Sequence, residues 1–423
     1  MESFRFVHAA RLLLDRQLQS AGPVPERVRP IVEDATLIAW ERVIECCLEE
    51  AVDLLLITGE CCDPADGGLR GFAGLARGLE RLAEHKIPVV VAAGPSTSAG
   101  AWLAGLDWPT NVTQLVGTDE IPILRDRKLL AIVRQGVGGP AARCSENPWL
   151  LRLPVDNEER PFNIWFTPGD SESPFWPADE MAHSFREPAG ANPGVGYHAA
   201  SGSAAPRTVS IDGTAIHDPG PIQALRPLET GPRGCTLVAV DASGKWKRTF
   251  VPTAPVRFEQ LGLSVTAEHT RDDLLLDMIA ALEQLPRHTS DRVWLIAWNI
   301  VCAGSCPPLL HDETARAQLL QTLESNHGLR DLHVHTQAVR IRTDRETPSG
   351  QALGDELSRE FDSRLQDRVA RSQWALARCL DDSRLHGGPW ETPLRSLLAD
   401  FDAGEIAVDA RDLGLRWLAV GKE

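Results

Sequence analysis

Residues 89–100 read "VVVAAGPSTSAG", and this stretch decides the fold. Five apolar residues follow Pro88 and end at Gly94, which is typical of a buried parallel strand at its carboxyl end. In α/β proteins, that end of a strand carries the chemistry. Here the turn supplies Pro95 and Ser96, and neither is a usual metal ligand or general base. The stretch therefore indicates an α/β sheet whose active-site loop lacks its chemistry.

The neighbouring segments alternate between strand and helix. Apolar runs at residues 4–9, 53–59 and 87–93 predict strands, and helical patterns cover residues 31–50 and 69–84. This alternation predicts a parallel sheet with crossover helices.

The pattern changes to short strands with Gly and Pro between them after about residue 111. Four of the expected strands are at residues 128–133, 162–166, 207–211 and 235–240. A smaller α/β section follows, with helices at 272–285 and 311–324 and strands at 292–301 and 332–343. The tail, residues 351–421, has apolar residues three or four apart and is expected to be mostly helical.

The composition is that of an acidic globular protein. The net charge of −16 argues against extensive autonomous DNA binding, because phosphate neutralisation drives such binding. Two local basic patches remain, at residues 125–128 and at 340–345. No apolar stretch is long enough to span a bilayer, and the first residues do not resemble a signal peptide.

The nine cysteines form no regular framework and predict free thiols in a reducing cytosol, so we expect a cytoplasmic protein. Cys302 and Cys306 have the spacing of half a metal clip, but no partner pair completes it. Buried or loop thiols are the favoured interpretation of this pair.

Five segments carry a family resemblance. They are "FRFVHAARLLLDRQLQ" (4–19), "DLLLITGECCD" (53–63), "PVVVAAGPST" (88–97), "GVGYHAASGSA" (194–204) and "HDPGPIQALRPLETGPRGCTLVAVD" (217–241). Together they resemble the SbcD-type DNA repair exonucleases, and most closely their YhaO-like branch. That family lies within the calcineurin-like metallophosphoesterases.

The resemblance implies a metallophosphoesterase-like four-layer α/β/β/α sandwich over residues 1–250. It also implies a smaller α/β capping domain over residues 251–346 and a helical C-terminal region over residues 347–423. Family members work beside a large coiled-coil ATPase of the ABC type, onto which the C-terminal helices dock. They are commonly dimers.

The family holds two Mn²⁺ ions with Asp, His and Asn side chains at strand ends. By register, its metal-ligand slots fall here on Arg11, Leu13, Glu60, Pro95, Pro168, Gly202 and Ala204, and its catalytic His slot falls on Ser96. Among these residues only Glu60 can bind a metal, and a lone carboxylate cannot hold two cations that each need about four to six donors. We therefore expect no bound metal and no catalytic residue.

Arg11 and Glu60 should lie past the ends of adjacent strands, and either charge would be costly to bury alone. We therefore expect an ion pair between them; the alternative is that Arg11 points to solvent. A replacement metal site at His8 and Asp63 is disfavoured. The same holds for a metal site at the His333–His335 pair, which lacks a third ligand.

These features predict a catalytically inactive subunit that scaffolds or regulates an SbcC- or YhaN-like coiled-coil ATPase in DNA repair or defence. DNA contact would be indirect or through a local patch, and no membrane contact is expected. The alternative is an active exonuclease or phosphodiesterase with an atypical or partner-completed metal site. Manganese-dependent cleavage of DNA discriminates the two.

Overall fold

The fold is taken from a computed structural model. It describes residues 1–14, 16–19, 24–62, 69–92, 108–115, 120–135, 161–167, 196–211, 214–304, 306–327, 329–344 and 364. The chain divides into two compact units. The first comprises Met1–Leu263, Arg271–Ile300 and Glu313–Arg340, and the second Ser264–Thr270, Val301–Asp312 and Ile341–Glu423. The predicted domain limits after residues 250 and 346 stay predictions.

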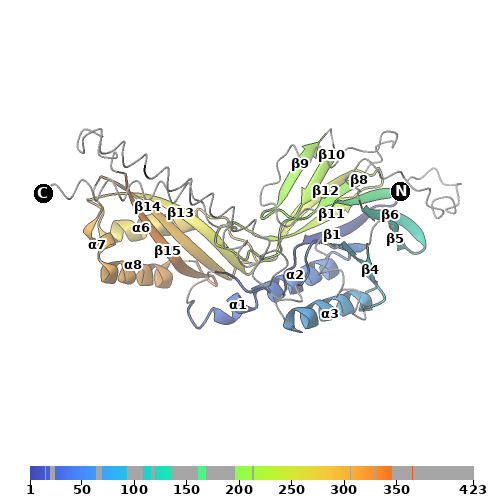
Figure 1. Ribbon diagram of the computed structural model, residues 1–423, viewed down its shortest axis with the longest axis horizontal. Coiled ribbons are helices and arrows are strands. Elements are labelled where there is room, and N and C mark those ends of the chain that lie inside the picture. The colour runs from blue at the N-terminus through green and yellow to red at the C-terminus, as the bar shows by residue number, and fades with distance from the viewer. Residues whose placement is uncertain are drawn as a thin grey trace. The chain divides into compact units, whose positions relative to one another are not determined.

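The first sheet has six strands in the order β12–β11–β1–β2–β3–β4 (Figure 1). Strands β1 to β4 pair in parallel, and β11 pairs with β1 in the antiparallel sense. The central strands are mostly apolar and buried, as expected for parallel strands covered on both faces. The strands span Phe4–Ala10 (β1), Leu54–Thr58 (β2), Val89–Ala92 (β3), Val112–Gln114 (β4), Gly234–Val240 (β11) and Trp246–Pro252 (β12).

Helices α2 (Ala35–Glu49) and α3 (Leu69–Glu84) cover one face of this sheet (Figure 1). The two helices approach each other closely. The indole Nε1 of Trp40 donates to the carbonyl of Gly74 at 3.1 Å. A Cβ added at Gly78 would lie 2.5 Å from the same nitrogen, so the glycines of α3 provide the space for the Trp40 ring.

The second sheet packs on the other face of the first. Its strand order is β5–β6–β7–β8–β10–β9, and apolar side chains from both sheets form the core between them. In that core, Tyr197 lies edge-on to Phe6 with ring centroids 5.1 Å apart. The strands span Glu120–Arg125 (β5), Lys128–Gln135 (β6), Phe162–Thr167 (β7), Gly196–Ala200 (β8), Arg207–Ile211 (β9) and Thr214–Asp218 (β10). The predicted α/β sandwich is confirmed.

A third sheet has the order β13–β14–β15 and is accompanied by α6 and α8, which contact each other. Val256 and Val293 of this sheet pack against Val28 and Val32. Val28 directly precedes α1 (Arg29–Glu33), and Val32 lies within it. The elements span Val256–Thr266 (β13), Arg271–Glu283 (α6), Val293–Ala303 (β14), Pro308–His311 (α7), Glu313–Asn326 (α8) and His333–Asp344 (β15).

One predicted helix is divided in the structure. The helix expected over residues 31–50 is α1 and α2, which meet at Asp34. The helix expected over residues 311–324 is α8, which begins and ends two residues later than predicted. The tail that we expect to be helical, residues 351–421, lies outside the described residues, apart from Arg364. Of the described helices, none is long and apolar enough to cross a membrane.

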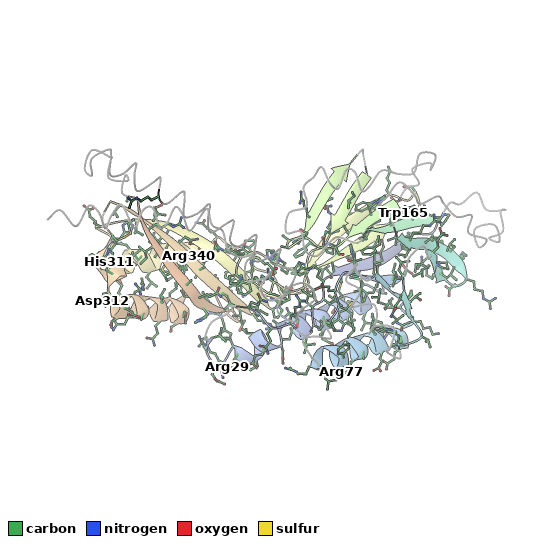
Figure 2. The ribbon with its side chains drawn as sticks, viewed as in Figure 1. Arg29, Arg77, Trp165, His311, Asp312 and Arg340 are labelled. Atoms are coloured by element: carbon green, nitrogen blue, oxygen red, sulfur yellow. A yellow bond between two sulfur atoms is a disulfide. The ribbon has the colours of Figure 1, made fainter. Side chains whose placement is uncertain are left out.

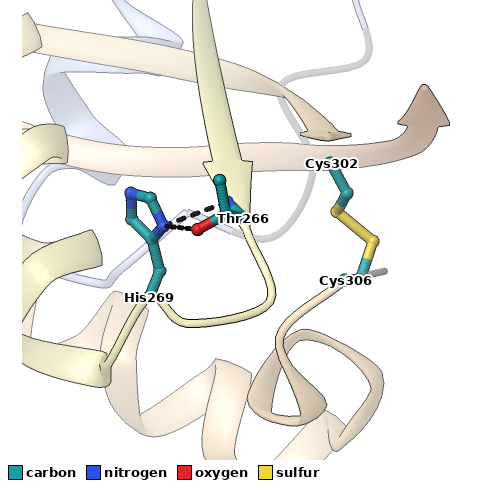
Figure 3. The surroundings of a disulfide bond; sticks show 4 residues. All are labelled: Thr266, His269, Cys302 and Cys306. Carbon is teal, nitrogen blue, oxygen red and sulfur yellow. Dashed lines mark hydrogen bonds between the residues drawn. A yellow bond between two sulfur atoms is a disulfide. The ribbon is translucent and has the colours of Figure 1, made fainter. Parts of the chain in front are cut away.

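The expectation of free thiols is wrong for Cys302 and Cys306, which form a disulfide (Figure 3). The chain turns back after β14 at Gly304, whose φ is +84°, and this turn brings the two Cα atoms to 5.1 Å. The metal-clip alternative is therefore also excluded for this pair. Among the described residues, Cys46, Cys47, Cys61 and Cys235 are buried free thiols, and Cys62 is buried as well.

Candidate functional site

The chain segments that follow β1 and β2 stay side by side. The amide of Arg11 donates to the carbonyl of Thr58 at 3.0 Å, and the amide of Leu14 donates to that of Cys61 at 3.0 Å. Arg11 and Leu13 both have positive φ, 48° and 47°, a conformation that L-residues seldom adopt. Such conformations concentrate at functional sites. The Leu13 side chain is buried, and it offers no donor to a cation.

Gly59 brings a third segment to this edge. Its φ is +76°, and an added Cβ would lie 3.2 Å from Ser201 Oγ and 3.4 Å from Arg11 Cγ. The glycine therefore allows the loop after β8 to pack against Arg11. That loop contains Gly202 and Ala204, the slots of the two expected histidines, and neither side chain can ligate a metal.

The backbone of Ser203 links two charged side chains across the site. Its carbonyl accepts a hydrogen bond from Arg11 Nη1 at 3.4 Å. Its amide donates to Asp218 Oδ2 at 2.7 Å, and the amide of Gly220 donates to Asp218 Oδ1 at 2.8 Å. The segments after β1 and β8 and the end of β10 are thus joined by a guanidinium, a peptide group and a carboxylate.

Asp218 is a site residue that the sequence reasoning missed. Burial raises the pKa of its carboxyl group to about 7, while the two amide donors and the Arg11 guanidinium oppose that rise. The signal in the sequence was its place as the last residue of β10, at a strand end; Arg11 and Glu60 also lie near the ends of their own strands.

Glu60 forms an ion pair with Arg16 at 3.7 Å, and both side chains are about three-quarters buried. The contact described for Arg11 is with Ser203 instead. The predicted pair between Arg11 and Glu60 stays a prediction. Pro95, Ser96, Pro168 and Asp63 lie outside the described residues.

Two buried histidines connect the sheets beneath this edge. His8 on β1 is hydrogen-bonded through Nδ1 to the Tyr197 hydroxyl and through Nε2 to Thr58 Oγ1, both at 2.9 Å. His217 on β10 is hydrogen-bonded through Nε2 to Thr236 Oγ1 at 2.7 Å. Both ring nitrogens of His8 are occupied, so His8 is a structural residue here.

The site does not fit a pair of metal ions. The described slot residues supply one carboxylate, Glu60, while Arg11 brings a permanent positive charge to the same edge. Within the described part of the chain, no group of three or more His, Cys, Asp or Glu side chains could hold a metal. His333 and His335 therefore belong to no such group, and His335 pairs with Glu324 at 3.0 Å.

The basic patch at residues 125–128 is largely neutralised by acidic neighbours. Lys128 Nζ lies 2.6 Å from Glu2 Oε1, and Arg125 Nη1 lies 3.4 Å from Asp53 Oδ1. The part of the patch at residues 340–345 that the structure describes includes Arg340 on β15 (Figure 2).

Comparison with known proteins gives one informative relative. No protein-family model matches the chain. The "Uncharacterized metallophosphoesterase YhaO" of Bacillus subtilis (strain 168) is 26% identical over 272 residues, which are 62% of this chain and 63% of that protein. The match thus spans less than two thirds of the relative's length. It supports the metallophosphoesterase superfamily as the wider group of this chain.

The crystal structure of TT1561 of Thermus thermophilus gives a TM-score of 0.31 at 12% identity. The match covers 59% of this chain and 99% of that one. A match at this level does not bear on the fold or the site. The α/β sandwich rests on the strand order described above.

Proposed function

We propose that this chain is an SbcD/YhaO-type, metallophosphoesterase-like subunit without phosphoesterase activity. It scaffolds or regulates an SbcC- or YhaN-like coiled-coil ATPase in DNA repair or defence. One observation carries the proposal: at the strand ends where the superfamily needs metal ligands, the chain has Arg11, Leu13, Gly202 and Ala204. A dication there would meet a guanidinium, an apolar side chain and two residues without donors.

The arrangement around Arg11 also supports a structural role for this edge. A two-metal site would tie the segments after β1, β2 and β8 through shared ligands. In this chain, Arg11 and Asp218 make a comparable connection through the Ser203 peptide group. The scaffold therefore keeps its loops joined without needing a metal ion.

The activity part of the proposal is tested with the purified full-length chain. We expect no manganese-dependent cleavage of single- or double-stranded DNA or of bis-p-nitrophenyl phosphate, and no stoichiometric metal by elemental analysis. The informative variant is Glu60→Gln, because Glu60 is the remaining carboxylate among the described slots. Stoichiometric manganese together with activity that Glu60→Gln abolishes would overturn the proposal in favour of an atypical active site.

The partner part is tested by co-expression with a coiled-coil ATPase encoded beside this chain. We expect the two to co-purify, and the ATPase rate to change on addition of the chain. A variant without residues 347–423 should lose the association, while Arg77→Gln on α3 (Figure 2) serves as a surface control that keeps it. Independent migration of the two full-length proteins contradicts the proposed scaffold role.

A further inference from the structure

A disulfide closes the turn at the end of β14 (Figure 3). It joins Cys302, within the strand, to Cys306, which lies shortly before α7, and it holds their Cα atoms 5.1 Å apart. Both cysteines lie in Val301–Asp312, one of the segments that make up the second unit. The bond therefore links the two sides of a single turn inside that unit.

Hydrogen bonds do not hold this turn closed. Among the described residues, no backbone hydrogen bond connects its two sides. The residues that follow Cys306 are Pro307 and Pro308, which have no N–H group to donate. A Cβ added at Gly304 would meet nothing within 4 Å, so the turn is not packed in place at that point either.

The turn after β13, in the same unit, is held differently (Figure 3). There the amide of Thr266 donates to His269 Nδ1 at 3.0 Å, and the amide of His269 donates to the carbonyl of Thr266 at 3.2 Å. That turn is closed by hydrogen bonds, whereas the turn at Gly304 is closed by a covalent bond. Because a disulfide that closes so short a loop adds less to global stability than one that closes a long loop, its effect is local.

A small thiol can approach the bond from the surface. Val301 is 38% exposed, and Ala303 and Gly304 are exposed as well, so the turn lies at the surface of the chain. Cys302 is fully buried, while Cys306 is 8% exposed. The sulfur open to attack is therefore Cys306 Sγ.

Four thiols described in the structure are placed differently, in the apolar core of the first unit: Cys46, Cys47, Cys61 and Cys235. Burial raises the pKa of the Cys61 thiol to about 12, so almost none of it is the reactive thiolate. The Cys235 thiol lowers the pKa of Cys46, but Cys46 is buried on α2. Among the described cysteines, the turn at Gly304 thus offers the most open position for exchange with a small thiol or disulfide.

We propose that Cys302 and Cys306 form a reversible redox switch in the second unit. To open it, an external thiolate attacks Cys306 Sγ, forms a mixed disulfide and releases Cys302 as a thiol. A second external thiol attacks the mixed disulfide and releases Cys306, so two external thiols become one disulfide while the protein disulfide becomes two thiols. An external disulfide such as oxidised glutathione reverses these steps and closes the turn.

The closed form fixes the start of α7 beside the end of β14. Helix α7 has four residues, and so short a helix is not stable by itself. In the open form the buried Leu310 still anchors α7, but the covalent link across the turn is gone. The switch therefore controls how readily the segment Val301–Asp312 opens. This inference goes beyond the proposed function and does not depend on it.

The test begins with a redox titration of the full-length chain. The protein is equilibrated at rising ratios of reduced to oxidised glutathione, quenched with acid and alkylated, and the peptide that contains both cysteines is analysed by mass spectrometry. We expect the pair to pass reversibly from disulfide to dithiol, while Cys46 and Cys235 stay thiols. A bond that neither glutathione nor dithiothreitol reduces in the folded chain overturns the switch. So does a pair that stays reduced in oxidised glutathione.

Hydrogen exchange measures the consequence for the chain. Reduction should speed amide exchange within Val301–Asp312 at least about tenfold, because loss of the link lowers the free energy of local opening. The double variant Cys302→Ser, Cys306→Ser should exchange at the fast rate whatever the glutathione ratio. The matched control is Ala303→Ser, at an exposed position of the same turn, which should respond as the wild type does. Equal exchange in the oxidised and reduced chains overturns the switch and leaves the proposed function intact.

Discussion

At position 218 a carboxyl group is enclosed between the loops that follow β8 and β10, where its charged form loses contact with water. Its pKa of about 7 in the folded chain exceeds the ordinary value of 3.8. Between those two values the folded state therefore binds more protons at Asp218 than the unfolded state does. It follows that Asp218 makes the free energy of unfolding fall as pH rises through this window.

Replacing Asp218 by asparagine removes this titration. We expect the free energy of unfolding of the wild type, minus that of Asp218→Asn, to decrease between about pH 4 and pH 7. The slope approaches at most about 1.4 kcal/mol per pH unit. Urea unfolding curves across that range measure it.

The matched control is Asp241→Asn, in the turn between β11 and β12. The Ser243 hydroxyl lowers the pKa of the exposed Asp241. The free energy of unfolding of the wild type, minus that of Asp241→Asn, should therefore not decrease over the same pH range. A difference between wild type and Asp218→Asn that stays constant with pH would contradict the prediction.

At the level of single residues, the sequence predicted where the site lies but not which residues meet there. Arg11 and Glu60 could be assigned to neighbouring strand ends because each follows a local apolar run. The contact between Arg11 and Ser203 joins residues 192 positions apart. It depends on how the two sheets pack, which no local pattern contains.

Among the elements, the contact between α2 and α3 is the most demanding sterically. The Trp40 ring fills the space above Gly78 and is fixed by its hydrogen bond to Gly74. We expect Gly78→Ala to lower the free energy of unfolding by about 1–3 kcal/mol, because overpacking outweighs the gain in helix propensity of about 1 kcal/mol. Urea unfolding together with the near-ultraviolet circular dichroism of tryptophan tests this.

The control for that change is Ala76→Gly, at an exposed position of the same helix. It should lower the free energy of unfolding by about 1 kcal/mol through helix propensity alone and leave the circular dichroism of tryptophan unchanged. A Gly78→Ala variant as stable as the wild type would show that α2 and α3 can separate freely.

Predictions for individual elements succeeded where a segment carries its own periodicity. The limits of α3 are those expected, since its apolar face repeats over the whole helix. Strand β12 was missed because none of its residues is fully buried and three of its first four residues are not apolar. Strand β13 was missed as well; its place in the third sheet is set by pairing with a strand distant in sequence.

For the whole molecule, acid should weaken the sandwich through the two histidines that join its sheets. Burial lowers the pKa of His8 well below 6.5 and that of His217 to about 4. Below pH 6.5 the unfolded chain thus binds more protons at these histidines than the folded chain. They cause the free energy of unfolding to fall as pH drops toward 4, and Asp218 opposes them.

His217→Gln is the variant that isolates this effect. It should be less stable than the wild type at pH 7, by about 1–3 kcal/mol, because Thr236 loses its buried partner. Between pH 6.5 and pH 4, the free energy of unfolding of the variant should decrease less than that of the wild type, as measured by urea unfolding. An equal decrease of the free energy of unfolding in both proteins would mean that His217 binds its proton as readily in the folded chain as in the unfolded chain.

The joint between Arg11, Ser203 and Asp218 also decides which side chains position 11 tolerates. Aspartate at position 11 would remove the donor that holds Ser203 and bring a second carboxylate toward the buried Asp218. Like charges in such a place repel. The new carboxylate would complete no metal site while Leu13, Gly202 and Ala204 remain. Aspartate at position 11 is thus unfavourable by itself, and a metal site could be built at this edge only by several substitutions made together.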